Sequence, residues 1–159
     1  MELVTRMNQA MDTNQFRNIL VGVNGTRGCE NAIEIAVSLA RSLGSRVILL
    51  GVIAPLSPES QAEGVGLDDA SLARTQLEEQ VRNSGEIARN LGIDVVAEIV
   101  EGFPEEEIER KAGEASADLI VVGYRDVGRV RRWLEGSTSE LLVRSSRASV
   151  LVVHDDSPQ

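Results

Sequence analysis

The sequence has few of the side chains on which most catalytic and metal sites depend. It contains one cysteine, one histidine and one lysine in 159 residues. A single cysteine excludes a disulfide framework within one chain, and a single histidine excludes a histidine-based triad or a multi-histidine metal site. Lys111 lies inside a helical pattern and not in a G-x-x-x-x-G-K-[ST] loop, so a P-loop enzyme is excluded as well.

Long apolar runs and an excess of basic charge are also missing. No run approaches the ~18 apolar residues that a membrane-spanning helix needs, and the chain shows no secretory signal pattern. The net charge is −9, whereas general nucleic-acid binding needs a broad basic surface. We therefore expect a soluble, cytoplasmic protein that binds neither membrane nor nucleic acid. Any site for an anion must be local.

What remains is the composition of an ordinary globular domain, with 42% apolar and 26% charged residues. The length fits a single domain, which we place at residues 16–155, followed by a tail at 156–159. The first fifteen residues are polar and lack a sustained apolar period, which predicts a flexible leader. A short helix that packs on a partner is the alternative.

Segments rich in valine, isoleucine and leucine predict the strands. They are residues 16–23, 45–53, 93–100, 118–123 and 148–154. Near-continuous apolar runs are typical of parallel strands that are covered on both faces. The segment 93–100 alternates more clearly, which indicates a strand at the edge of the sheet.

Apolar residues at helical spacing alternate with these strands. The predicted helices cover residues 29–43 and 69–91, and two more begin at Pro104 and near Ser137. The segment from Ala54 to Leu67 is rich in proline, glycine and serine and is predicted as a flexible flap. Strand and helix therefore alternate along the domain. This order predicts a five-stranded, parallel, doubly wound α/β sheet.

Ligands of such sheets bind beyond the carboxyl ends of the strands. After the first strand, the stretch "GVNGTRG" has neither the G-x-G-x-x-G spacing of a dinucleotide site nor the acids of a phospho-acceptor site. Cys29 joins the apolar stripe of the first helix and is expected to be a buried small residue. His154 is expected at a strand end or an interface, and Trp133 is expected to anchor its loop to the protein body.

The loop after the fourth strand is the main candidate for chemistry. It begins at Gly123, crosses four arginines between residues 125 and 132, and reaches Gly136-Ser137-Thr138 where a helix begins. Glycine lets backbone approach an anion, and a helix start offers unpaired N–H donors. The hydroxyl groups there can bind phosphate or cap the helix. Spacing alone therefore leaves two interpretations open, a phosphate cradle and a capped helix after a long loop.

Three stretches carry a resemblance to a known family: "ILVGVNGT", "EGFPEEEIERKAGEASADLIVVG" and "GSTSELLVRSSRASVLVV". Over residues 16–154 the sequence resembles the universal stress protein family. The resemblance implies a Rossmann-like fold of the adenine-nucleotide-hydrolase type and a homodimer that pairs through the last strand. It also implies that ATP or another adenine nucleotide, with or without magnesium, binds a G-x-x-G-(nine residues)-G-[ST] loop, assisted by an acid after the first strand.

Two positions depart from the family pattern. Gly123 and Gly136-Ser137 fit it, but Asp126 replaces the middle glycine and Asn24 replaces the acid. Two like charges about 4 Å apart repel by roughly 4 kcal/mol at an effective dielectric of 20, so Asp126 opposes a nearby phosphate. The neighbouring arginines can offset that repulsion. The candidate nucleotide-binding residues are Asn24, Gly25, Thr26, Val52, Gly123, Arg125, Asp126, Gly136, Ser137, Thr138 and Ser139.

Two functions are compatible with these residues. In the first, adenine lies near Val52 and Ile53, ribose near Asn24 and Gly123, and phosphates at residues 136–139. In the second, the chain has lost nucleotide binding and is a dimeric interaction module. No general base or metal-binding acid cluster is evident, so we assign no catalytic or metal residue and expect at most a weak ATPase. The apolar last strand predicts a homodimer, because exposed apolar edges are usually covered.

Overall fold

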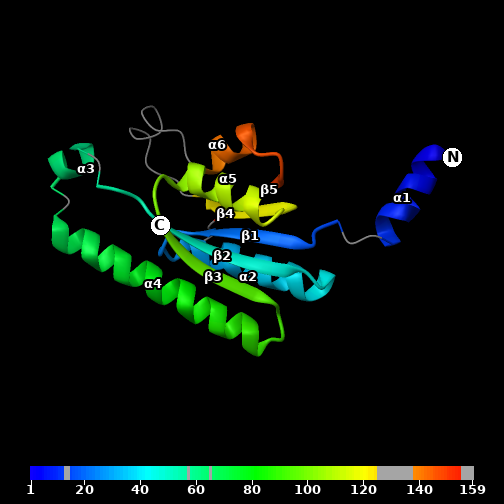
Figure 1. Cartoon of the computed structure of the whole chain (residues 1–159), viewed down its shortest axis with the longest axis horizontal. Helices are drawn as coiled ribbons and strands as arrows, with labels where there is room; N and C mark the ends of the chain where they lie inside the picture. Colours follow the sequence, from blue (N-terminus) through cyan, green and yellow to red (C-terminus); the bar gives the residue numbers. More distant parts are fainter. Residues whose placement is uncertain (13–14, 57, 65, 125–137, 155–159) are drawn as a thin grey trace.

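The computed structural model describes residues 1–12, 15–56, 58–64, 66–124 and 138–154. Its centre is a parallel sheet of five strands in the order β3-β2-β1-β4-β5 (Figure 1). The strands are β1 (Asn18–Val23), β2 (Arg46–Ile53), β3 (Val95–Glu101), β4 (Leu119–Tyr124) and β5 (Ser149–His154). The predicted fold class is therefore confirmed, and each strand begins one or two residues later than the sequence pattern indicated. β3 lies at one edge, as its alternating pattern predicted, and β5 lies at the other.

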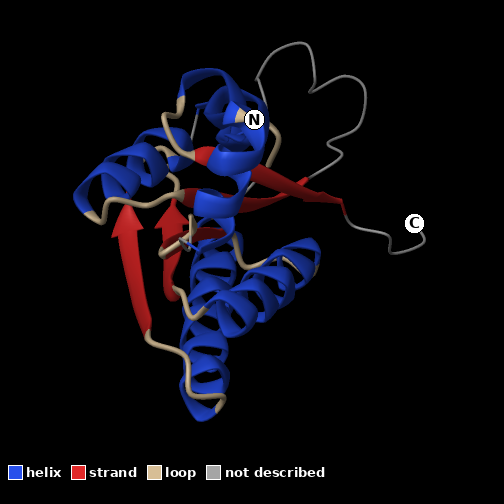
Figure 2. Cartoon of the chain, turned by 90° about the vertical axis from the view of Figure 1, so that its right-hand side faces the viewer, coloured by secondary structure: helices blue, strands red, loops and turns tan. Residues whose placement is uncertain are grey.

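Helices cover both faces of this sheet (Figure 2). One face carries α2 (Gly28–Leu43) and α4 (Leu67–Asn90), and the other carries α5 (Pro104–Glu114) and α6 (Thr138–Ser145). Successive side chains of β1, the central strand, pack on opposite faces of the sheet. Ile19 and Val21 belong to the buried cluster under α2 and α4, whereas Leu20 belongs to the cluster under α5 and α6. This double burial is the physical reason for the continuous apolar run in the sequence.

The order of the strands creates a switch point between β1 and β4. From β1 the chain moves outward to β2 and β3, and it then returns to the other side of β1 to form β4. α2 and α4 lie on one face, whereas α5, which makes the return, and α6 lie on the other. The connections that leave β1 and β4 therefore diverge to opposite faces and open a crevice at the carboxyl edge, where sheets of this kind bind ligands.

Two segments that were predicted to be flexible contain helices. The leader forms α1 (Glu2–Asp12), and the flap contains the short helix α3 (Pro58–Ala62). Figure 1 shows α1 apart from the domain. A short helix was the alternative kept open for the leader, and the apolar stripe of α1 spans only three turns, too few for its period to stand out in a polar segment. In the flap, Pro58 begins α3, a position at which proline favours a helix.

Candidate functional site

The loop between β1 and α2 forms one side of the switch point, and Asn24 organises it. The Asn24 side-chain oxygen accepts a hydrogen bond from the Thr26 N–H at 3.0 Å and another from the Thr26 hydroxyl at 2.6 Å. This is an Asx turn, in which a side chain closes the loop in place of a backbone group. The family resemblance implies an acid at this position. The Asn24 side chain takes its place as a hydrogen-bond acceptor that holds the loop in shape.

Gln80 fastens the same loop to α4. Its side-chain oxygen accepts from the Gly25 N–H at 3.0 Å, and its side-chain nitrogen donates to the Thr26 carbonyl oxygen at 2.9 Å. One amide group thus satisfies a backbone donor and a backbone acceptor on adjacent residues. The sequence analysis did not identify Gln80, although a signal was present: the residue follows Leu77 by three positions on the face of α4 that packs inward.

Gly25 is glycine for two structural reasons. Its φ is +79°, in the left-handed region, and a Cβ atom there would lie 3.2 Å from both the backbone nitrogen and the Cα atom of Leu77. The loop therefore rests directly on the backbone of α4. From the sequence, Gly25 was a candidate nucleotide-binding residue, and the structure shows that it permits a close approach between two segments of the protein.

The end of β4 lies directly beside the first turn of α2. A Cβ atom on Gly123 would lie 3.3 Å from the carbonyl oxygen of Gly28 and 3.6 Å from the Cα atom of Cys29. Gly123 and the β1–α2 loop are therefore neighbours, as the candidate site requires. Within the described part of the chain no side chain caps the start of α2. The N–H groups of Cys29 and Glu30 donate to the carbonyl oxygens of Thr26 and Arg27 at 3.2 and 3.0 Å, and the positive end of the helix dipole lies on this side of the crevice.

Cys29 lies below this crevice and does not face it. Its side chain is buried and its thiol donates to the Gly22 carbonyl oxygen at 3.3 Å. Burial raises the pKa of the Cys29 thiol above its ordinary value, and the negative charge of Glu30 acts in the same direction. A buried protonated thiol is a poor nucleophile. The interpretation of Cys29 as a small buried residue is confirmed.

The end of β2 contributes apolar surface. Val52 and Ile53 are both half-buried, and they pack on opposite faces of the sheet, Val52 with the cluster under α5 and Ile53 with the cluster under α4. The carbonyl oxygen of Ile53 accepts from the Gly102 N–H at 3.0 Å, which joins the ends of β2 and β3. The candidate adenine contacts thus lie on the same carboxyl edge as Asn24 and Gly123.

The other side of the switch point is described only from Thr138 onward. α6 ends four residues before β5 starts at the amino edge, so its first turn faces the carboxyl edge. Thr138 is half-buried in that turn, and the Ser139 side chain is buried, with 5% of its surface exposed. Arg125, Asp126, Gly136 and Ser137, which are candidate nucleotide-binding residues, lie outside the described residues, as does Trp133.

An aromatic pair lies at the ends of β4 and β5, beside this region. Tyr124 and His154 are the last residues of β4 and β5, and their ring centroids are 4.8 Å apart. His154 is exposed. The expected position of His154 at a strand end is therefore confirmed.

Metal-binding and membrane-spanning features were also sought. The described residues contain no group of three or more histidine, cysteine, aspartate or glutamate side chains that could hold a metal ion. Over the same ranges, no helix combines the length and apolar character needed to cross a bilayer.

Together these features define an α/β protein with an open parallel sheet and a ligand crevice at its switch point. Comparison with known proteins identifies the family: the model of the universal stress protein family matches residues 15–154. A curated relative from Staphylococcus aureus (strain USA300), which carries a universal stress protein designation, is 32% identical over 143 residues. The alignment covers 89% of this chain and 86% of that relative. The chain belongs to the universal stress protein family.

Solved structures agree with this assignment. A universal stress protein in complex with cAMP has 26% sequence identity and a TM-score of 0.70, over 88% of this chain and 98% of that one. The UspA protein from Lactobacillus plantarum has 22% identity and a TM-score of 0.68, over 87% of this chain and 97% of that one, and supports the fold.

Proposed function

We propose that this universal stress protein acts in the stress response by binding an adenine nucleotide, such as ATP, ADP or AMP, at the carboxyl ends of β1 and β4. The observation that carries the proposal is the close approach of Gly123 to the first turn of α2. It brings the end of β4 against the first turn of α2 at the switch point, where such sheets bind ligands. The cAMP complex of the similar universal stress protein supports this choice of ligand.

The chemistry along the edge suits the parts of an adenine nucleotide. Val52 is a half-buried apolar residue that can cover one face of a purine. Ile53 packs on the opposite face of the sheet, so it meets the purine only at the end of β2. Asn24 and Gly123 border the place we assign to the ribose. The first turn of α6, with Thr138, offers backbone N–H groups and a hydroxyl to phosphate oxygens. In this arrangement the protein binds and orients the nucleotide, and no residue is assigned to catalysis.

Calorimetric titration of the purified protein with ATP, ADP, AMP and cAMP, each with and without magnesium, tests the proposal. We expect saturable heat for at least one of them with one site per chain. Nucleotide released from the denatured protein, detected by its absorbance and mass, would be independent support. The absence of heat for every nucleotide at high micromolar concentration would contradict the proposal.

A matched pair of threonine variants tests the position of the phosphates. Thr138→Ala removes a hydroxyl at the proposed phosphate end, and we expect affinity to fall about tenfold, since a hydrogen bond to a charged group contributes roughly 1.5–3 kcal/mol. Thr75→Ala is the control, because the Thr75 hydroxyl donates to the Ser71 carbonyl oxygen on exposed α4. Equal affinities for the two variants would place the phosphates elsewhere.

The alternative function is a dimeric interaction module without nucleotide, and the replacements Asp126 and Asn24 favour it. Asp126→Gly separates the possibilities. If Asp126 repels phosphate, the variant gains affinity with or without magnesium. If Asp126 holds a magnesium ion beside the phosphates, the variant loses affinity only when magnesium is present. An interaction module predicts that the unmodified protein binds no nucleotide and that Asp126→Gly restores binding.

We further propose that two chains pair through β5 and that the protein acts in the cytoplasm. β5 is an edge strand on which Val150, Leu151 and Val152 are all partly exposed. A second copy of β5 would cover this apolar edge. Sedimentation at tens of micromolar should show a dimer, and a monomer would contradict the pairing. Fractionation of cells that express the chain checks the compartment.

A further inference from the structure

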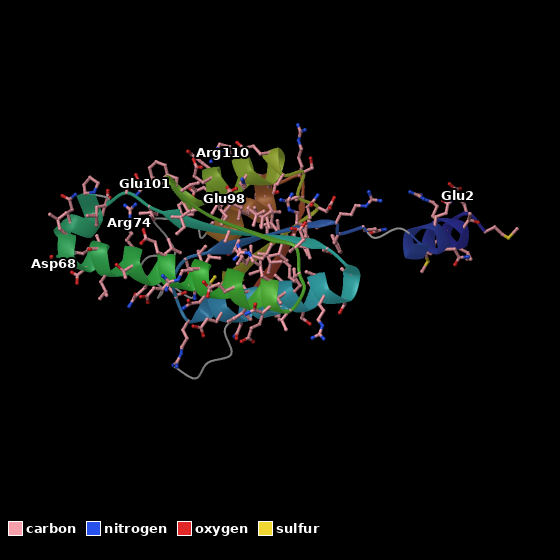
Figure 3. All side chains as sticks on the ribbon, turned by 60° about the horizontal axis from the view of Figure 1, so that its bottom comes forward. Glu2, Asp68, Arg74, Glu98, Glu101 and Arg110 are labelled. Carbon is pink, nitrogen blue, oxygen red and sulfur yellow. The ribbon has the colours of Figure 1, made fainter. Side chains whose placement is uncertain are left out.

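A groove of about 950 Å³ lies between α2 and α4, on the outer side of the helical layer. Its apolar lining includes Ile33 and Val37 from α2 and Ile87 and Leu91 from the C-terminal part of α4. Ile87 is 60% exposed and Leu91 is 47% exposed, which is unusual for large apolar side chains grouped in one groove. Figure 3 shows α2 and α4 in this layer below the sheet. The rest of the lining is mostly polar or charged, so the groove offers exposed apolar surface in one part only.

The chain also carries an apolar helix that needs such a surface. On α1, Leu3, Val4 and Met7 are 69%, 60% and 57% exposed. These residues share one face, because positions three and four apart are neighbours on a helix. An isolated helix of 11 residues is marginal in water, so α1 gains stability if it packs against another element. We propose that α1 folds back onto its own domain and packs its apolar face into the α2–α4 groove.

The connection between α1 and the domain permits this placement. Phe16 packs against the cluster under α2 and α4, and its carbonyl oxygen accepts a hydrogen bond from the Ser45 hydroxyl just beyond the end of α2. The Arg46 N–H also donates to the Arg17 carbonyl oxygen at 2.8 Å. The chain thus leaves β1 on the same face as the groove. Four Cα steps from Phe16 back to Asp12 span at most about 14 Å, enough to reach the groove at Arg41 and Leu91.

The lengths and the charges of the two surfaces also match. With Asp12 at the Arg41 end, α1 runs parallel to α2 and covers about 16 Å of the roughly 21 Å between Arg41 and Arg27. Because both helices rise equally per residue, Met7 then lies level with Ala36, one residue from Val37, and Arg6 lies level with Ile35, one residue from Glu34. Arg6 is the basic side chain of α1, and Glu34 is on the rim of the groove. A cation therefore meets an acid where the apolar faces meet.

This placement carries α1 toward the β1–α2 loop. Gly25, Thr26 and Gln80 line the far end of the same groove, so the N-terminal turn of α1 would end near the loop that Gln80 holds. The docked helix would then limit the outward motion of α4 and of that loop. Docking of α1 does not require a bound nucleotide.

Disulfide trapping in the full-length chain tests the proposal. Met7→Cys combined with Val37→Cys, oxidised with copper phenanthroline at low protein concentration, should give an intrachain crosslink that migrates faster on a non-reducing gel. The control pairs Met7→Cys with Val143→Cys, an exposed position on α6 across the sheet. Crosslinking no faster than the control would overturn the proposal. A covalent dimer as the main product would also overturn it, because α1 would then dock on a second copy.

Hydrogen exchange gives a readout that needs no cysteine. We expect the α1 amides to exchange at least tenfold more slowly than in an unfolded peptide. We expect that protection to be lost in Ile87→Asp, which changes an exposed side chain of the groove, while the sheet amides remain protected. Unprotected α1 amides in the unmodified protein, or protection that survives Ile87→Asp, would refute the docking.

Discussion

Replacing Gln80 by alanine removes both hydrogen bonds that join the β1–α2 loop to α4. The bonds measure 3.0 Å to the Gly25 N–H and 2.9 Å to the Thr26 carbonyl oxygen. A hydrogen bond of this kind contributes about 1 kcal/mol net. Both are part-buried, so we expect the free energy of unfolding to fall by about 2 kcal/mol.

Equilibrium unfolding in urea measures this change, and Gln76→Ala is the matched control. Gln76 is the same residue type on the same helix, one turn earlier, and its side chain is exposed. An exposed substitution of this type should change stability by no more than about 0.5 kcal/mol. If the two variants are equally stable, the reasoning that Gln80 anchors the loop is wrong.

A third variant separates the two bonds. Gln80→Glu keeps the acceptor for the Gly25 N–H but replaces the donor to the Thr26 carbonyl oxygen with a charged oxygen. We expect it to be less stable than the unmodified protein at neutral pH and to recover in part under acid conditions, because a protonated carboxyl can donate again. A stability difference that is independent of pH would argue against the bond to Thr26.

Each of the other predictions compares one variant with a second variant or with the unmodified protein. Gly25→Ala and Gly92→Ala both place alanine at a φ near +80°, but only Gly25 meets the backbone of Leu77. In urea unfolding, both variants should lose about 1–2 kcal/mol of stability, because alanine is disfavoured in the left-handed region. Gly25→Ala should lose more than Gly92→Ala. Equal losses would mean that the close approach to Leu77 does not affect stability. Burial raises the pKa of the Cys29 thiol above its ordinary value of 9.0, so the folded state keeps a proton that the unfolded state releases. Stability should therefore fall as pH rises above about 9, and Cys29→Ser should fall less steeply if this linkage is correct. Lys111 has 16% of its side chain exposed and pairs with Glu98 at 2.5 Å. Lys111→Met should lose about 1–2 kcal/mol by leaving that carboxylate without its partner, while Arg144→Met, which breaks an exposed pair with Glu140, should change stability by less than about 1 kcal/mol in the same assay.

The arrangement of the sheet could be predicted because local patterns record burial. The run from Ile19 to Val21 is apolar at every position since both faces of β1 are covered. Pro104 and the acidic residues after it mark the start of α5 because they satisfy the open end and the dipole of a helix. Such signals need only neighbours along the chain, so one sequence is enough to read them.

The candidate site was predicted only in part. Asn24, Gly123 and the end of β2 were assigned to one edge from the rule that parallel strands carry ligands at their carboxyl ends, and the structure places them there. The role of Gln80 in holding the β1–α2 loop was not predicted, because its hydrogen-bond partners lie 54 and 55 positions away in the sequence. A polar residue on an inward helical face indicates that a partner exists, but it does not say which one.

By itself, the sequence determined the class of fold, the alternation of strands and helices, and the loops that reach the carboxyl edge. Those properties follow from burial, capping and backbone preference, each of which acts over a few residues. Only the tertiary structure decided why Gly25 must be glycine, what holds the loop beside it, and that a groove lies between α2 and α4. These depend on which distant surfaces approach each other, and that approach is set by the packing of the whole chain.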